Sequence, residues 1–168
     1  MKIIAIFVLV LVIVAFLFIF SKEPPTPEGF VTNRSVENYS TFFYNYEIVR
    51  YPSSVEIMSV ENITETVILG FNTEPWNINF GIIPGNGSYA TRTIRVSNKE
   101  DSDTEIILRT YGNISPLVVF NSNNFILKPG ENSSIDISLY TKDSDPGNYS
   151  GEIDVLSKKP IYNFLSII

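Results

Sequence analysis

The amino-acid sequence divides into one unbroken apolar run and a longer region in which apolar and polar positions alternate. The run extends from Ile3 to Phe20 and contains no polar residue. Further along, Ile135, Ile137 and Leu139 alternate with more polar neighbours. A run of about 20 apolar residues is typical of a membrane-spanning helix, whereas a period of two is typical of a β-strand with one buried face. The pattern therefore predicts a single N-terminal transmembrane helix followed by an all-β domain.

Other strand-like runs recur at short spacing, separated by turn signals such as Pro129-Gly130. Ile153 and Val155 alternate with Glu152 and Asp154, which predicts a strand whose carboxylates face water. In all, roughly eight or nine strands in one domain favour a sandwich of two packed sheets. Further strands are expected at residues 43–51, 55–60, 66–71, 93–97, 105–111, 116–120 and 124–127.

The apolar run has three possible interpretations: an uncleaved signal anchor, a cleaved signal peptide and a buried helix. Its 18 residues give a helix of roughly 27 Å, close to the thickness of a bilayer core. A cleavage site needs small residues, whereas Phe18, Ile19 and Phe20 are large. We therefore expect residues 1–21 to be a transmembrane signal anchor. Lys2 on one side and Lys22 with Arg34 on the other leave its orientation open.

A proline-rich segment follows the apolar run. SKEPPTPE, beginning at Ser21, has three prolines in eight residues, and such segments favour an extended, semi-rigid spacer. We expect residues 22–38 to be a stalk that lifts the domain off the membrane. The β-sandwich domain is then expected at residues 39–168, which is enough chain for one hydrophobic core.

Composition excludes several classes of function. The formal net charge is −6, so no broad basic surface is expected to bind nucleic acid. Cysteine and histidine are both absent, which removes disulfides, thiolate nucleophiles, imidazole bases and the usual ligands of zinc and haem. We accordingly expect no cofactor, no metal and no enzymatic activity.

Asparagine sequons bear on the side of the membrane. N-x-[ST] triplets occur more often than the asparagine, serine and threonine content would generate by chance. Because glycans attach to exposed chain on the translocated side, we expect a cytoplasmic N-terminus and an extracellular C-terminal domain in the cell membrane. Asparagine and serine also enrich turns, which is the alternative reason for such triplets. The seven candidates are Asn33, Asn38, Asn62, Asn86, Asn113, Asn132 and Asn148.

Two acidic loops are candidates for cation binding. Asp143 and Asp145 with Asn148 resemble a sparse calcium loop, but Pro146 interrupts it and no downstream carboxylate completes it. A second loop contains three acidic residues between positions 100 and 103. Both are expected to be solvated turns.

Glu152 and Asp154 are the candidate pair for glycoside hydrolysis, which needs two carboxyl groups facing each other across a cleft. Since both are expected on one exposed strand face with nothing to raise either pKa, we expect no such activity. A carbohydrate-binding or glycan-processing domain is therefore a disfavoured alternative.

Aromatic residues gather early in the domain, and a sugar-stacking or partner surface is one interpretation. A strand with one aromatic face in the core is the favoured one, and the single tryptophan, Trp76, is expected in the core as well. The apolar tail from Pro160 to Ile168 is expected either to pack as a final strand or to add to a sheet of another protein. The aromatic residues are Tyr39, Phe42, Phe43, Tyr44, Tyr46 and Tyr51.

The stretch from Trp76 to Val155 also has a recognisable cadence. It includes NFGIIPGNGSYATRTIRVSN, FILKPGENSSIDISLY and DPGNYSGEIDV, with turns at Phe80-Gly81 and Pro129-Gly130 and Gly151 inside the last strand. This cadence resembles the immunoglobulin-like sandwich modules of archaeal and bacterial surface proteins and, more loosely, the major-sperm-protein and hydin-like group. The resemblance implies an immunoglobulin-like fold and names no active site.

These observations lead to a functional expectation. The chain is expected to be a non-enzymatic, membrane-anchored surface protein, of the kind found in archaea with a glycosylated surface. Its partners would be the lipid bilayer, through Ile3 to Phe20, and another envelope or surface-layer protein. The alternative is an accessory protein similar to the archaellum or pilus stator proteins, which also join one N-terminal helix to an immunoglobulin-like domain that contacts the surface layer.

Overall fold

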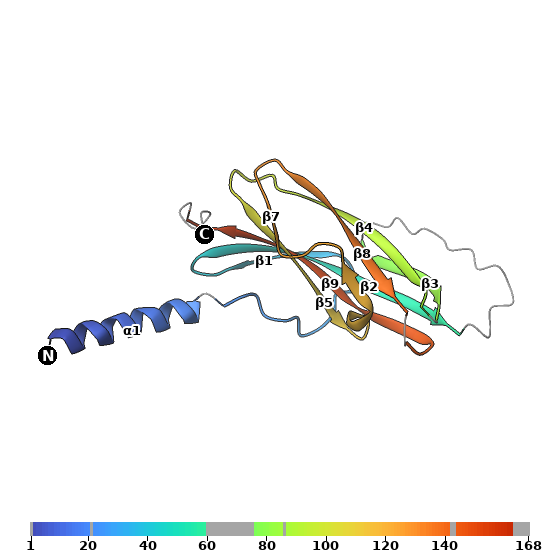
Figure 1. Cartoon of the computed structure of the whole chain (residues 1–168), viewed down its shortest axis with the longest axis horizontal. Coiled ribbons are helices and arrows are strands. Elements are labelled where there is room, and N and C mark those ends of the chain that lie inside the picture. Colours follow the sequence, from blue (N-terminus) through green and yellow to red (C-terminus); the bar gives the residue numbers. More distant parts are fainter. Residues whose placement is uncertain (1, 21, 60–75, 86, 142–143, 163–168) are drawn as a thin grey trace.

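The computed structural model describes residues 2–20, 22–59, 76–85, 87–141 and 144–162. It begins with helix α1 (Lys2–Phe20), which is followed by strands and a short 3-10 helix (Figure 1). The elements after α1 are β1 (Ser35–Ser40), β2 (Tyr44–Met58), β3 (Ile78–Pro84), β4 (Tyr89–Ser97), β5 (Thr104–Gly112), η2 (Ser115–Leu117), β6 (Val118–Phe120), β7 (Phe125–Leu127), β8 (Asn132–Tyr140) and β9 (Gly147–Pro160).

The strands form two sheets, so the expected all-β two-sheet sandwich is confirmed. Sheet A has the order β1-β2-β9-β5-β7, and β3 joins it beside β2. Sheet B has the order β4-β8-β6. From β4 onward, successive strands alternate between the two sheets, so each connection crosses from one layer to the other. All described pairings are antiparallel except that of β2 with β3.

Strand β2 is one long strand where the sequence predicted two. The expected break falls at Pro52, which lacks a backbone N–H. β2 pairs with β1 through residues 45–50 and with β3 through residues 53–58, so Pro52 lies where the outer partner changes. At Pro52 neither β1 nor β3 needs a backbone hydrogen bond from β2, so the missing N–H costs nothing there. The other edge of β2 stays paired with β9 past this point.

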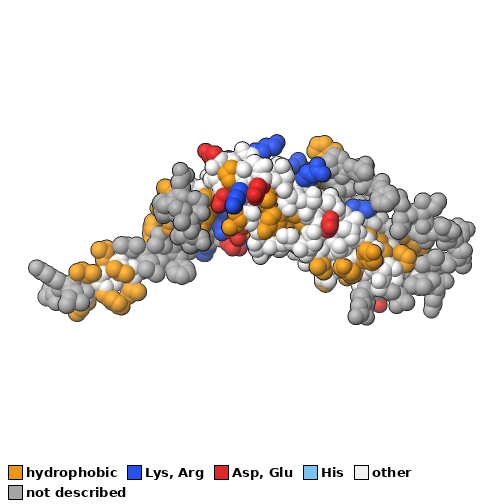
Figure 2. All heavy atoms as spheres, turned by 45° about the horizontal axis from the view of Figure 1, so that its top comes forward, with side chains coloured by type: hydrophobic (Ala, Val, Ile, Leu, Met, Phe, Trp, Pro, Cys, Tyr) orange, Lys and Arg blue, Asp and Glu red, His pale blue; other side chains and the backbone are white. Residues whose placement is uncertain are grey.

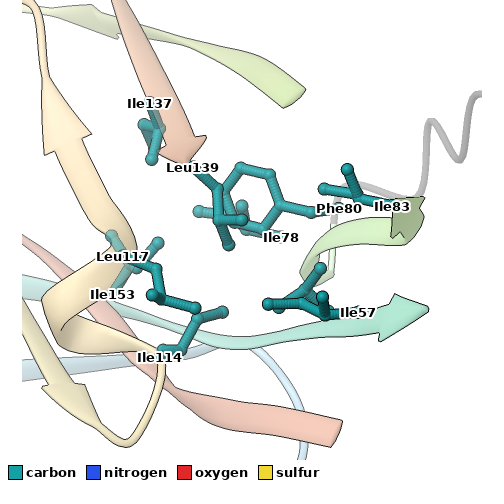
Figure 3. Close-up of a cluster of buried hydrophobic side chains, with 10 residues drawn as sticks. Ile57, Ile78, Phe80, Ile83, Ile114, Leu117, Ile137, Leu139 and Ile153 are labelled. Atoms are coloured by element: carbon teal, nitrogen blue, oxygen red, sulfur yellow. The ribbon is translucent and has the colours of Figure 1, made fainter. Parts of the chain in front are cut away.

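The core lies between the sheets and follows the period of two. In β8, Ile135, Ile137 and Leu139 have no exposed surface, as their alternation predicts. Ile57 of β2 and Phe80 of β3 meet this cluster from sheet A (Figure 3). Burying each such side chain contributes about 1.5–3 kcal/mol, and this domain has no disulfide to supplement it.

Helix α1 lies apart from the sandwich (Figure 1). Its seven successive side chains from Ile6 to Val12 are each at least 51% exposed, and seven residues make two turns, so every face of this part of the helix exposes apolar surface. Figure 2 shows apolar side chains on the face of the helix that is in view. Judged on the described residues alone, the chain contains no helix with both the length and the hydropathy that crossing a membrane requires.

The segment expected to be a free stalk lies instead against the outer face of sheet A. We call residues 23–31 the strap. Pro24 within it is buried, and the backbone N–H of Val31 donates to Glu152 in β9. Residues 35–40, counted with the stalk in part, form the edge strand β1. Polyproline-type backbone suits this packing as well as it suits a spacer, because both are extended.

Several other expectations differ from the structure. β1 and β3 were not predicted, because β1 is polar on both faces and β3 is interrupted by Gly81, which has a φ of 79°. Trp76, expected in the core, is 59% exposed. The strand expected at residues 66–71 lies outside the described residues.

Candidate functional site

A groove opens between the two sheets where sheet B does not cover sheet A. It has a volume of about 440 Å³. Val49 and Val155 form part of its floor on the inner face of sheet A, and Ile94 and Val96 of β4 form its wall. The groove therefore has an apolar base and lies along an edge strand of sheet B.

The rim of the groove is charged. Arg34, Arg95, Lys99 and Lys159 line it together with Glu47 and Glu100, so four basic and two acidic residues give a net charge of +2. Lys159 and Glu100 form an ion pair of 2.7 Å, whereas neither Arg95 nor Lys99 takes part in the ion pairs that the described side chains form. This concentration of positive charge stands out in a protein whose net charge is −6.

The wall of the groove is an open strand edge. β4 pairs with β8 on one side, and in the described part of the chain no strand pairs with its other side. The first half of β4 lies beside β3, since Arg92 Nε donates to the carbonyl of Asn79 at 2.8 Å. Its second half faces the groove. An exposed strand edge is a template for an added strand.

Asn98 fixes the end of this wall. Its side chain is buried and donates to the carbonyl oxygens of Ser102 and Leu127, at 2.8 and 2.9 Å. Its Oδ1 accepts from the backbone N–H of Glu100 at 3.0 Å. Because every polar atom of this side chain is used, the end of β4 is held in place rather than left free to close the groove.

A second polar cluster lies on the opposite face of sheet A, beneath the strap. Glu152 and Asp154 of β9 are both buried there, although the sequence predicted a wet face. Arg50 Nε donates to Glu152 at 2.7 Å, and Arg50 also binds Glu37 at 2.7 Å. The same guanidinium donates to the carbonyl of Gly29 at 3.0 Å. Arg50 thus connects β9, β1 and the strap.

Arg109 of β5 makes the matching contacts on the other side of β9. Asp154 lies opposite Arg50 in β2 and opposite Arg109 in β5. The Arg109 guanidinium pairs with Glu23 and donates to the carbonyl of Pro24. Both arginines that flank Asp154 therefore direct hydrogen bonds to other groups, and Asp154 Oδ1 has no partner.

This arrangement corrects the expectation that nothing perturbs the carboxyl pair. Burial raises the pKa of Asp154 to about 8, aided by its hydrogen bond to Glu152 and by the negative charge of that residue, while Arg50 acts in the opposite direction. Asp154 is therefore neutral at pH 7 and Glu152 is paired with Arg50. A raised pKa is one requirement of a general acid, but these two groups face the strap and do not line the groove.

The structure places five of the seven sequons, and all five asparagines are exposed. Asn33 and Asn113 lie in a bend and a turn, but Asn38, Asn132 and Asn148 lie in β1, β8 and β9, where the sequence had predicted loops. Asn62 and Asn86 are outside the described residues.

The remaining candidates are distributed through the domain. In the ranges that the structure describes, no three acidic side chains gather as metal ligands do, and Asp143 is outside those ranges. Glu100 pairs with Lys159, while Asp101 is exposed and Asp103 is half-buried. The aromatic residues separate: Tyr51 packs in the core between the sheets, Tyr39, Tyr44 and Tyr46 pack together on the outer face of sheet A, and Phe42 is exposed.

Sequence reasoning missed the groove and the arginines beneath the strap. The basic residues of the groove are spread from position 34 to position 159, so no local motif joins them. Arg50 did carry a signal, because it is expected on the same strand face as Tyr46 and Ile48. A basic residue on such a face needs a partner if the face is covered.

Comparison of the chain with protein families, with curated proteins and with solved structures finds no match.

Proposed function

We propose that this chain is a non-enzymatic, membrane-anchored surface protein whose immunoglobulin-like sandwich binds an acidic, extended segment of another envelope protein in the groove between its sheets. The open groove along the edge of β4 that no described strand occupies carries the proposal. The resemblance of residues 76–155 to surface modules agrees with it, as does the sandwich architecture.

The anchoring part of the proposal rests on the sequence of residues 3–20 and on the exposure of α1. A surface helix of a soluble domain normally has one polar face, but the described side chains from Ile6 to Val12 are apolar and exposed on all sides. A lipid environment removes this apolar surface from water. The extracellular orientation rests on the sequons, whose five described asparagines are all exposed.

The binding part follows from the chemistry of the groove. A strand added to β4 would satisfy the backbone groups of that edge and would lie above Val49 and Val155. The net charge of +2 favours carboxylates on the incoming segment, with Arg95 and Lys99 as their partners.

The test combines crosslinking with charge reversal. A photoreactive benzoylphenylalanine in place of Arg95, in the full chain in native membranes, should crosslink to an acidic, extended stretch of one envelope protein. The purified partner should then bind the native chain, and Arg95→Glu with Lys99→Glu should weaken binding by at least about tenfold, since repulsion replaces attraction.

Lys128→Glu is the control, because Lys128 is exposed, undergoes the charge reversal that each of the two groove residues undergoes, and does not line the groove. It should leave binding unchanged. Equal losses in the control and the groove variants, or crosslinks at position 95 that do not map to an acidic segment, would contradict the proposed site.

A further inference from the structure

One end of the sandwich carries a cluster of aromatic and aliphatic side chains, exposed or half-buried, that the groove does not use. We call it the aromatic end and define it as Phe42, Phe43, Ile161 and Tyr162. Phe42 and Phe43 form the turn between β1 and β2, and the other two residues directly follow β9. Phe42 is 45% exposed, and Ile161 and Tyr162 are each 40% exposed.

The aromatic end is held in place by the sheet. The backbone N–H of Ile161 donates to the carbonyl of Phe43 at 2.8 Å, and Tyr44 lies opposite Pro160 in the ladder. The Phe42 ring meets the Phe43 ring edge-on, with centroids 5.0 Å apart, and lies 6.2 Å from the Tyr162 ring. Thr41 closes the turn, because its hydroxyl both donates to and accepts from the backbone of Tyr44. These contacts fix apolar side chains at the surface at the cost of leaving them in water.

The chain enters the domain at this same end. Along the strap, Glu23 binds Arg109, Gly29 binds Arg50, and Val31 binds Glu152. Arg109 and Arg50 both lie opposite Asp154 of β9, whereas Val31 binds Glu152, which is farther along β9 from the aromatic end. The strap therefore runs away from Phe42 as it leaves α1. Figure 1 shows α1 leading away from the end of the sandwich that carries the β1–β2 turn and the end of β9. Lys22, between helix and strap, is exposed.

We infer that the aromatic end lies in the interfacial layer of the bilayer that holds α1, so that the domain rests on the membrane surface instead of standing above it. Phenylalanine and tyrosine rings bury apolar area at the level of the headgroups, where the hydroxyl of a tyrosine can stay hydrated. The strap supports this placement, because a segment bound along sheet A leaves only residues 21 and 22 between helix and domain. The inference rests on the anchoring part of the proposed function.

Brominated lipids test this contact. Trp76 is the only tryptophan, so Trp76→Phe with Phe42→Trp gives a chain with one reporter at the aromatic end. The full chain is reconstituted in phosphatidylcholine vesicles, with bromine on the acyl chains near the headgroups as quencher. A tryptophan at position 42 should shift its emission to shorter wavelength and lose most of its intensity to the brominated lipid.

The native chain is the matched control. Trp76 is 59% exposed and lies beyond the far end of β1, since its carbonyl accepts from Arg34, and the six residues of β1 span roughly 20 Å. Its emission should be unaffected by bromine. Tyr162→Trp in the Trp76→Phe background gives a second reporter in case the first variant loses its β-sheet circular dichroism.

The outcomes separate the two proposals. If the chain resists extraction by alkaline carbonate but the reporters at positions 42 and 162 are quenched no more than Trp76, the anchor stands and the inference is wrong. If carbonate releases the chain, the anchoring part of the proposed function is wrong, and the inference is overturned with it.

Discussion

Asp154 is a carboxylic acid that the fold keeps protonated at neutral pH. Its neighbours within the cluster are Arg50, Arg109, Glu23, Glu37 and Glu152, two cations and three anions. With Asp154 neutral, these charges sum to −1, and its ionisation would bring the sum to −2 in a buried site. Burial and the adjacent Glu152 therefore favour the protonated form of Asp154 over the ionised form.

This raised pKa makes stability depend on pH. The folded chain holds the Asp154 proton up to a pKa of about 8, whereas the unfolded chain releases it near the ordinary value of 3.8. The folded state binds more protons in between, so the free energy of unfolding falls as pH rises from about 4 to about 8, with a slope approaching roughly 1.4 kcal/mol per pH unit. Asp154→Asn should flatten this slope and make the protein more stable than the native chain at pH 8.

Urea unfolding followed by circular dichroism in detergent micelles, at constant ionic strength, measures both slopes. Asp101→Asn removes an exposed carboxylate from a loop and should keep the native slope. A native chain whose stability is constant or increases between pH 5 and pH 8 would show that Asp154 is ionised in the folded state.

The sequence anticipated some features of single residues and missed others. A glycine inside a strand, such as Gly151, is expected where another segment approaches closely, and an added Cβ at Gly151 would clash with the carbonyl oxygen of Tyr111. Glycine at such a site can be inferred because the reason is local to one strand. The burial of Glu152 could not be inferred, because the group that covers it, Val31, is 121 positions away. Exposure of Trp76 likewise depends on the path of distant strands.

At the level of elements, alternation identified the strands whose two faces differ. β8 and β9 were expected from their patterns, and β5 differs from its expected bounds by one residue at each end. β1 was missed because an edge strand with no buried face has no period of two. The groove was missed for a related reason: no described strand pairs with the outer edge of β4, and periodicity reports strands, not the gaps beside them.

Polar contacts hold the strap on sheet A, and those made by Arg109 are the nearest to its start. Arg109→Ala removes the ion pair with Glu23 and the hydrogen bond to Pro24. Because Glu23 is largely exposed, we expect a loss of only about 1 kcal/mol, confined to the strap. Hydrogen exchange should show faster exchange at the Val31 amide and unchanged protection in β9.

Lys159→Ala is the control for the strap, since Lys159 pairs with Glu100 and lines the groove, on the other face of sheet A from the strap. It should leave exchange at Val31 as it is in the native chain. Uniform loss of protection in β9 after Arg109→Ala would mean that the strap and the sheet unfold together.

At the scale of the whole molecule, α1, the aromatic end and the sequons make one consistent arrangement. In the arrangement we propose, α1 and the aromatic end face the bilayer, and the described asparagines of the sequons are exposed on the domain. Asn148 at the start of β9 lies opposite Glu56, near the end of the sheet remote from Phe42. A glycan there would lie at the end of the domain remote from the proposed membrane contact, at a residue that does not line the groove.

Glycan mapping tests this arrangement on the native protein. We expect glycopeptides at Asn132 and Asn148, which are exposed and far along the chain from the anchor, because an outer domain presents both to the transferring enzyme. Asn113 should be modified less, since its Oδ1 accepts a hydrogen bond from the Ser150 amide at 2.6 Å and this holds the side chain against β9. Asn98, buried and outside any sequon, is the internal control and should be unmodified. Mass spectrometry of tryptic peptides from native membranes gives the occupancy of each site. Unmodified asparagine at all seven sequons would remove the basis for placing the domain outside the cell, while the bromine quenching at position 42 would still report whether it rests on a bilayer.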